Sequence, residues 1–440
     1  MLVNDAIKGD SCPALTSPLR LPCGVVLGNR VAKAAMTEGL ANRSNGATDA
    51  HVRLYERWAR GGAGLMITGN VQVDRRYLER AGNIVIEANI SSEERGALRR
   101  MAAISTQWGG ELWMQLSHAG RQTPKTVNRQ PVAPSSVAMK IPGKNFGVPR
   151  ALSPWEIDDI RQRFVHAAVV ARECGFTGVQ VHSAHGYLLS EFLSPRANQR
   201  TDEWGGCLEN RARLLRAIVA DMRKALGADF PISVKLNTSD FQRGGFSLEE
   251  SLRVVGWLEA HGVDLLEISG GTYEQPKMLG LSGMLEPEVE AAQKAGPARE
   301  GYFMAHVAAL QRAARLPLMV TGGFRTRTGM LQALSEGVGV IGLARPLCTE
   351  PELCAELLAG RLEQLPCWEN SLQLGRGLLS RKSPLSMVKL INGFGLIGWY
   401  YEQLLRLGRG EEPDTDLSVW SAFWKWQRGE RKAARALQAP

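Results

Sequence analysis

Residues 180–213 read QVHSAHGYLLSEFLSPRANQRTDEWGGCLENRAR. A short apolar run ends at His182. Two further polar residues, His185 and Tyr187, follow it closely, and a long polar loop rich in arginine comes next. A buried run that ends in polar side chains is typical of a parallel strand whose carboxyl end opens onto a functional site. This stretch therefore predicts a strand at Gly178–His182 with reactive side chains at its end.

Seven further runs of this kind recur along the chain. Most are apolar and several lack alternation, which suits parallel strands that are buried on both faces. The predicted strands are Arg30–Met36, Gly64–Gly69, Glu111–Leu116, Gly178–His182, Ile232–Leu236, Leu265–Ile268, Leu318–Thr321 and Val338–Leu343. Segments with helical spacing lie between them, among them Ile157–Cys174, Leu208–Leu226, Leu248–His261 and Gly301–Ala314.

Eight strands that alternate with helices predict an α/β fold, a (β/α)₈ TIM barrel over residues 1–350. The competing open doubly wound sheet usually shows GxGxxG after its first strand, whereas this chain continues with AKAAMTEGLA. Residues 351–440 change character, because they contain several helical patterns and a concentration of tryptophan. We expect them to form a helical C-terminal extension that packs on the barrel or on a partner subunit, so a homo-oligomer is possible.

Composition narrows the functional classes. The chain has 440 residues, of which 44% are hydrophobic and 22% are charged, and it lacks the apolar run of about 20 residues that a membrane helix needs. The start MLVNDAIKGD does not resemble a signal peptide, so we expect a cytoplasmic protein. The net charge of +9 is mild and no basic run is interleaved with aromatic residues, which disfavours nucleic-acid binding. The seven cysteines form no CxxC pair, so we expect neither a disulfide framework nor a metal site.

Glycines and an arginine follow the last two predicted strands. Gly322 and Gly323 follow strand seven, and Gly342-Leu-Ala-Arg345 closes strand eight. Glycine turns let backbone N–H groups approach an anion, and a guanidinium adds a fixed positive charge. Barrels often bind phosphate at this place, so the two turns predict a phosphate site.

Several motifs of the sequence together resemble those of a known family. The signature VHSAHGYLLSEFLSPRANQRTDEWGGCLENRAR is similar to that of the Old Yellow Enzyme family of FMN-dependent ene-reductases. AKAAMTEGLA, MQLSHAGRQ, TGGFRTRTGM and GLARPL match the family in the same order, over about Leu19 to Leu353. The resemblance implies an enzyme that binds FMN, takes hydride from NADH or NADPH, and reduces an electron-poor C=C bond of a small molecule.

The resemblance also implies a role for each matching residue. The residues expected to bind FMN are Ala35, Met36 and Thr37 along the ring, Gly69 and Gln115 on its pyrimidine side, Lys235 near N1, and Gly322, Gly323, Ala344 and Arg345 at the phosphate. His182 and His185 would hydrogen-bond the carbonyl or nitro oxygen of the substrate, and Tyr187 would donate a proton opposite the hydride. Two N–H donors stabilise a developing enolate as an oxyanion hole does, and a tyrosine is an adequate acid toward a carbanion-like carbon.

Several positions depart from the family pattern. Lys235 stands where the family often has arginine, so it supplies positive charge without a fork of donors. Thr37 replaces the cysteine of one branch, and the cysteines after the barrel lack the iron–sulfur motif of another. The remaining polar residues of the signature are expected to pin the loop to the barrel rim: Arg196, Asn198, Arg200, Asp202, Glu209, Asn210 and Arg211.

Three other functions stay open at this stage. The first is a dehydrogenase of amines or other small molecules on a related flavin barrel. The second is a phosphate-binding lyase or aldolase barrel, in which Lys235 would form a Schiff base. The third is a flavin-storing or partner-binding barrel without turnover, in which the helical extension would carry the function.

Overall fold

The computed structural model describes residues 13–141, 145–271, 300 and 303–438. Residues 1–12, to which the expectation about a signal peptide refers, lie outside this part of the chain, as do the first two residues of the predicted helix Gly301–Ala314. The predicted barrel is confirmed. Its strands are β3 (Val31–Lys33), β4 (Leu65–Ile67), β6 (Glu111–Ser117), β9 (Gly178–Ser183), β10 (Ile232–Asn237), β11 (Leu265–Ser269), β12 (Leu318–Thr321) and β13 (Val340–Leu343).

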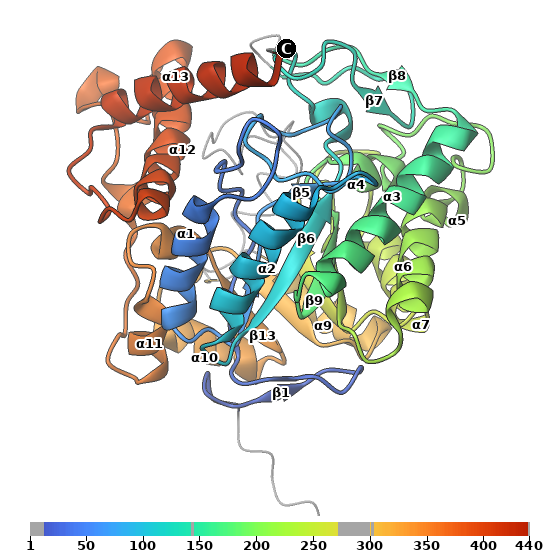
Figure 1. The fold of residues 1–440 in the computed structure, drawn as a ribbon, viewed down its shortest axis with the longest axis horizontal. Coiled ribbons are helices and arrows are strands. Elements are labelled where there is room, and N and C mark those ends of the chain that lie inside the picture. The colour runs from blue at the N-terminus through green and yellow to red at the C-terminus, as the bar shows by residue number, and fades with distance from the viewer. Residues whose placement is uncertain (1–12, 142–144, 272–299, 301–302, 439–440) are drawn as a thin grey trace, which may run out of the picture.

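All eight strands pair in parallel, and the ring closes because β13 pairs with β3 and β4 pairs with β6 (Figure 1). A ninth, two-residue strand, β5 (Val71–Gln72), joins the carboxyl end of β6. Each predicted strand is present: β3, β4 and β13 are shorter than predicted, β12 has the predicted bounds, and the other four extend one residue further. The carboxyl ends of the ring strands therefore meet at one face, where the site residues were predicted.

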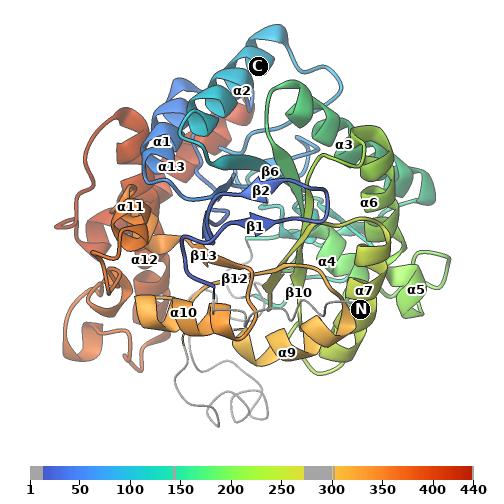
Figure 2. The same cartoon turned by 90° about the horizontal axis from the view of Figure 1, so that it is seen from below.

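Helices surround the ring, as the view from below shows (Figure 2). They are α1 (Asp49–Arg60), α2 (Ser92–Thr106), α3 (Pro154–Glu173), α6 (Arg213–Leu226), α7 (Leu248–Ala260), α9 (Met304–Ala313), α10 (Arg327–Ser335) and α11 (Leu353–Leu358). The predicted helix Leu208–Leu226 is broken: α5 (Leu208–Arg211) has Ala212 as its C-cap, and the same residue is the N-cap of α6. In the capping box that starts α3, the Ser153 hydroxyl accepts from the Glu156 backbone N–H.

A short hairpin closes the amino-terminal end of the ring. Its strands, β1 (Leu19–Arg20) and β2 (Val26–Leu27), are antiparallel and lie across the barrel opening in Figure 2. Leu21 and Leu27 of this segment pack with Trp113 and other inward residues of the ring in a small core of their own. A second, larger core fills the space between the strands and the surrounding helices. The hairpin leaves the opposite, carboxyl end of the barrel as the open one.

The C-terminal extension packs on the barrel of its own chain. Its main helices, α12 (Ser386–Arg409) and α13 (Val419–Gln438), pack on each other, and α12 lies beside α1 (Figure 1). Trp399 is fully buried, and its indole N–H donates to the Leu417 carbonyl at 2.9 Å. Arg53 of α1 donates to the Gly408 carbonyl at 2.8 Å, which ties the end of α12 to the barrel.

Within the described residues, no helix combines the length and the apolar character that crossing a lipid bilayer requires.

Candidate active site

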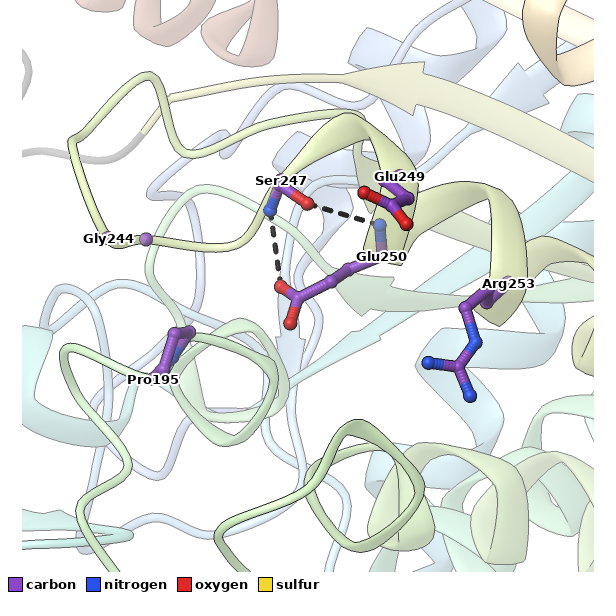
Figure 3. Close-up of a pocket in the computed structure, with 7 residues that line it drawn as sticks. Pro195, Gly244, Ser247, Glu249, Glu250 and Arg253 are labelled. Carbon is purple, nitrogen blue, oxygen red and sulfur yellow. Dashed lines mark hydrogen bonds between the residues drawn. The ribbon is translucent and has the colours of Figure 1, made fainter.

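A surface pocket of about 380 Å³ lies at the start of α7 (Figure 3). Its lining includes Ser247 and Glu250, whose backbone and side-chain groups form a reciprocal helix cap. Glu250 also pairs with Arg211, so its carboxylate is already neutralised. None of the predicted site residues lines this pocket, and the polar groups of the barrel interior form a different and more elaborate arrangement.

The centre of that arrangement is a buried ion pair. Lys235 of β10 lies opposite Glu267 of β11 in the ladder, and its ammonium nitrogen is 3.0 Å from the Glu267 carboxylate. Glu267 also accepts hydrogen bonds from the Thr321 hydroxyl at 2.7 Å and from the Gln180 amide at 2.9 Å. A buried ion pair is tolerated when further hydrogen bonds satisfy both partners, and Glu267 has them.

Gln115 extends this network to β6. Its side-chain amide donates to the Gln180 carbonyl at 2.6 Å, and its backbone N–H donates to the Thr68 hydroxyl at 2.9 Å. The structure thus brings Gln115 and Lys235, both predicted site residues, into one chain of polar contacts. Gln180 and Glu267, which connect them, were not predicted.

His182, His185 and Tyr187 form a compact cluster. The ring centres of the two histidines are 5.0 Å apart, and those of His182 and Tyr187 are 4.8 Å apart. His182 lies beside Lys235 in the ladder, and its Nδ1 accepts from the Ala184 N–H at 3.2 Å. Burial, and secondarily the neighbouring His185 and Lys235, hold the pKa of His182 well below its usual value. The ring is therefore neutral and carries its proton on Nε2, as a hydrogen-bond donor.

His185 is held by residues of β10, β11 and the short helical turn after β6. Its backbone has φ of 63°, in the left-handed region, and its N–H donates to the Asn237 side chain at 3.1 Å. Gln122 donates to the His185 carbonyl at 2.7 Å, and the ring Nε2 is 2.5 Å from the Ser269 hydroxyl at the end of β11. Burial, followed by the charge of Lys235, lowers the pKa of His185 well below its usual value. The sequence motif did not identify Ser269 as a partner of this histidine.

Tyr187 is buried, with 3% of its surface exposed, and it is the N-cap of α4 (Leu188–Leu193). Its hydroxyl donates to the carboxylate of Glu79, which lies in the loop after β5. The same carboxylate accepts from the Thr37 hydroxyl and the Asn70 amide. The structure thus joins Thr37 and Tyr187, two predicted site residues, through a carboxylate that was not predicted.

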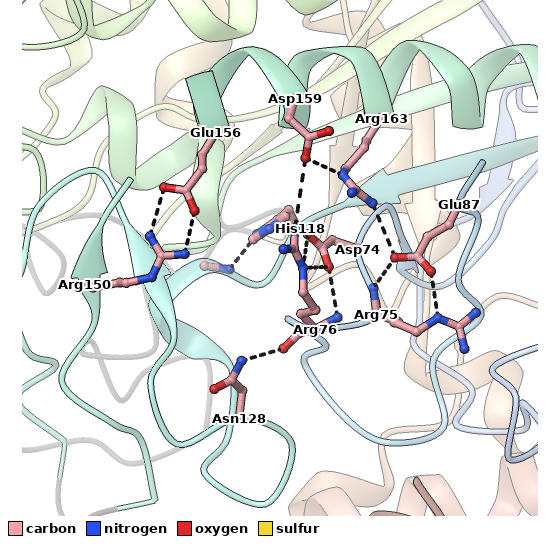
Figure 4. A network of polar contacts seen from close by, with 11 residues as sticks. Asp74, Arg75, Arg76, Glu87, His118, Asn128, Arg150, Glu156, Asp159 and Arg163 are labelled. Carbon is pink, nitrogen blue, oxygen red and sulfur yellow. Dashed lines mark hydrogen bonds and ion pairs between the residues drawn. The ribbon is translucent and has the colours of Figure 1, made fainter. Parts of the chain in front are cut away.

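The loop that carries Glu79 is anchored at both of its ends (Figure 4). Asp74 is completely buried and accepts from the Arg76 guanidinium at 2.6 Å, while Glu87 pairs with Arg75 at 2.7 Å and with Arg163 of α3 at 3.3 Å. Figure 4 also shows His118, at the end of β6, beside Asp74. Its Nδ1 accepts from the Gly120 N–H at 3.1 Å, and burial lowers its pKa to about 4.

The predicted residues after the first strand lie against Gly69. The Gly69 N–H donates to the Glu38 carboxylate at 2.9 Å, and a side chain on this glycine would collide with that carboxylate and with the Met36 carbonyl. The Met36 sulfur is 3.6 Å from that of Cys348, in the short helical turn η3 (Arg345–Cys348) that follows Ala344. Ala35 packs with the small core of the ring interior. The close contact explains why position 69 requires glycine.

The predicted phosphate site contains a cluster of arginines. Gly322 and Gly323 have φ of 103° and 88°, which favour glycine, and Arg345 pairs with Glu369 of the extension at 3.2 Å. Glu369 also pairs with Arg325 and accepts from the Tyr400 hydroxyl. Burial would raise the pKa of Glu369, but its hydrogen bonds and the two guanidinium groups outweigh burial and lower it to about 2.

These arginines and glycines are groups that an FMN phosphate would require. Two guanidinium groups and a glycine turn are typical phosphate ligands, and the Glu369 carboxylate is an anion held by both arginines. A second carboxylate, that of Glu300, accepts from the backbone N–H groups of Arg325 and Thr326 at 3.0 and 2.9 Å. The residues present therefore fit the phosphate of the predicted cofactor. Arg325 and Glu369 were not predicted as part of this site.

Comparison with known proteins decides the family. A sequence profile of the NADH:flavin oxidoreductase / NADH oxidase family matches residues 15–364. The chain belongs to this family. It is 37% identical over 355 residues to the NADH-dependent flavin oxidoreductase iliE of Hypocrea jecorina, covering 76% of this chain and 86% of that protein.

Solved structures give the same assignment. The Old Yellow Enzyme homologue from Zymomonas mobilis matches at a TM-score of 0.66 and 25% identity, over 81% of this chain and 95% of its own. A complex of 2-naphthoyl-CoA reductase with 2-naphthoyl-CoA matches at a TM-score of 0.70 and 25% identity, over 79% of this chain and 52% of that one. The protein is thus an FMN-dependent NADH:flavin oxidoreductase, and the resemblance seen in its sequence motifs is confirmed.

We predict that His118 makes the stability of the oxidoreductase depend on pH. Its pKa is about 4 in the folded protein and about 6.5 when unfolded, so folding favours the neutral ring. This contribution is complete above pH 6.5 and is lost as the pH falls toward 4, which amounts to about 2 kcal/mol between pH 8 and pH 5. The free energy of unfolding in urea, measured at both pH values, should fall less in His118→Asn. Parallel losses in the two proteins would contradict this assignment.

We predict that Glu369→Gln strengthens FMN binding to the apoprotein by about tenfold, because the phosphate no longer competes with a carboxylate for Arg325 and Arg345. Quenching of flavin fluorescence during titration measures the dissociation constant. Glu363→Gln removes an exposed charge of the same segment and serves as the control. Weaker FMN binding in Glu369→Gln would show instead that the carboxylate holds the arginines in place for the phosphate.

Proposed function

We propose that the protein is an ene-reductase, which uses NADH or NADPH to reduce an electron-poor C=C bond of an α,β-unsaturated carbonyl compound or a nitroalkene. The observation that carries the proposal is the cluster of His182, His185 and Tyr187 at the carboxyl end of β9, next to the positive charge of Lys235. The cluster combines two hydrogen-bond donors with one weak acid, which is the set that this reaction needs.

FMN, when bound, accepts hydride from the nicotinamide and supplies it to the alkene. We infer that the residues around its place divide into two groups. One would lie along the ring system: Ala35, Met36, Thr37, Gly69, Gln115 and Lys235. The other would hold the phosphate: Gly322, Gly323, Ala344, Arg345 and, in addition, Arg325.

The two histidines would bind the oxygen of the substrate. Hydride addition to the β-carbon builds negative charge on that oxygen, and neutral imidazole N–H groups stabilise the charge in a low-dielectric site. The lowered pKa values of His182 and His185 support this role, because each ring keeps a neutral N–H donor. For His185, the substrate oxygen would compete with the Ser269 hydroxyl for the ring nitrogen.

Tyr187 would protonate the α-carbon of the substrate. Its burial excludes bulk water from the reacting carbon, and its hydroxyl is fixed by the contact with Glu79. A dehydrogenase of amines or other small molecules on the same barrel is the alternative. Reoxidation of the reduced enzyme by a panel of enones, nitroalkenes and dienoyl thioesters distinguishes the two, because a dehydrogenase would not turn over alkenes.

We predict that replacing both histidines, in His182→Ala/His185→Ala, weakens the binding of phenol-type ligands by at least about a hundredfold while FMN stays bound. The estimate assumes that each hydrogen bond to a phenolate oxygen contributes about 1.5–3 kcal/mol. Ligand binding is followed by the long-wavelength absorbance of the flavin complex, with His261→Ala at the end of α7 as the control. Undiminished phenol binding in the double variant would refute the proposed role.

We predict that Tyr187→Phe slows reoxidation of the reduced enzyme by an enone by about a hundredfold or more, whereas reduction of the flavin by NADH or NADPH keeps its rate. General acids typically contribute factors of about 10² to 10⁴. Stopped-flow absorbance measures the two half-reactions separately. An equal loss in both half-reactions would contradict the assignment of Tyr187 as proton donor.

A further inference from the structure

We propose that Glu79 is a positioning and proton-relay residue, which carries protons between solvent and the hydroxyl of Tyr187. The inference rests on the proposed ene-reductase function and extends it, because it identifies how the proton donor is recharged after each turnover. Glu79 lies outside the sequence motifs that mark the site, in a loop that is anchored to the C-terminal extension.

Three hydrogen-bond donors converge on the Glu79 carboxylate. The Tyr187 hydroxyl and the Asn70 amide donate to Oε2, and the Thr37 hydroxyl donates to Oε1. The three residues come from three parts of the barrel: Thr37 follows β3, Asn70 follows β4, and Tyr187 follows β9. The carboxylate is therefore oriented from several sides, with one oxygen held at the hydroxyl that the proposed reaction deprotonates.

Glu79 and Tyr187 differ in their access to water. Tyr187 is buried, whereas the Glu79 side chain is partly exposed. A buried acid that gives up a proton in every turnover must regain it from a group that solvent can reach. Glu79 satisfies both conditions, because it is hydrogen-bonded to the tyrosine and is partly exposed.

The neighbouring residue Arg80 fixes the loop from the side of the extension. Its guanidinium lies 3.9 Å from the ring centre of Tyr401 in α12 and pairs with Glu430 in α13. The backbone N–H of Arg80 donates to the Asn83 side chain at 2.9 Å. Burial raises the pKa of Tyr401 to about 12, so this ring stays uncharged while Arg80 and Glu430 compensate each other. Glu79 is the acidic group that faces Tyr187 from this loop.

The proton steps balance without any further reactant. The Tyr187 O–H bond breaks as its proton goes to the α-carbon, which leaves a phenolate. The Glu79 carboxylate then takes up a proton from water and passes it to the phenolate. One O–H bond of water breaks, one O–H bond forms on the tyrosine, and the carboxylate is regenerated while hydroxide leaves to solvent.

The test uses the FMN-loaded protein reduced with NADH under anaerobic conditions and then mixed with 2-cyclohexenone. We expect Glu79→Gln to reduce the reoxidation rate at least about tenfold and to leave flavin reduction unchanged. In a Tyr187→Phe background the same substitution should have no further effect, because the relay acts through the tyrosine. Glu93→Gln, which removes an exposed carboxylate in the first turn of α2, is the control.

Three results separate the possible failures. An unchanged reoxidation rate in Glu79→Gln overturns the relay, and an equal loss in the wild-type and Tyr187→Phe backgrounds shows that Glu79 supports the fold of the site instead. If the reduced wild-type enzyme is not reoxidised by 2-cyclohexenone or by any other alkene of the panel, the proposed ene-reductase function itself is refuted.

A spectroscopic measurement tests the contact without turnover. With 3-fluorotyrosine at position 187 of the oxidised holoenzyme, the ¹⁹F signal reports the charge beside the phenol. Glu79→Gln should shift that signal, because it removes the carboxylate that the hydroxyl contacts, whereas Glu93→Gln should leave it in place. An unshifted signal in Glu79→Gln would overturn the proposed contact in solution.

Discussion

The buried ion pair between Lys235 and Glu267 is the constraint on which the arrangement of the site depends. A carboxylate without exposure inside a barrel must be neutralised and fully hydrogen-bonded, and Glu267 achieves this with Lys235, Thr321 and Gln180. Because these partners come from neighbouring strands, satisfying one charge fixes the register of several strands at once. Lys235 also pairs with His182 in the ladder, and burial, then the neighbouring His185 and then the lysine charge lower the pKa of His182 and keep its imidazole a neutral donor.

The groups of the site come from two sources. The ring strands supply the residues that stay in place by ladder register, which are the ion pair, the glutamine network and His182. Loops and the C-terminal extension supply two further carboxylates, those of Glu79 and Glu369. Glu79 engages the hydroxyl of Tyr187 at one end of the site, while Glu369 engages the arginines at the other. The extension contacts both ends, through Glu369 directly and through the residues around Arg80.

Much of the fold is visible in the sequence because buried parallel strands are apolar on both faces and each is followed by a helical pattern. Residues within such strands could have been found by alternation: Gln180 and Glu267 are each two positions before a predicted or observed site residue, His182 and Ser269. Glu79 and Glu369 carry no such signal, since Glu79 lies in a loop, Glu369 lies in the short helical turn η4 (Trp368–Asn370), and both reach the site through tertiary packing. The break at Ala212 was missed for a similar reason, because helical spacing continues through it.

The position of Arg80 between the ring of Tyr401 and the carboxylate of Glu430 has a consequence for exchanging parts between relatives. A chimera that imports the loop after β5 without α12 and α13 would bury the Arg80 guanidinium without its counter-ion, Glu430, and without the aromatic ring of Tyr401 that it contacts. The reverse graft would leave a carboxylate and a phenol ring facing an unmatched loop. Loop and helices therefore form one transplantable module, and designers who reshape the entrance of this barrel have to move them together.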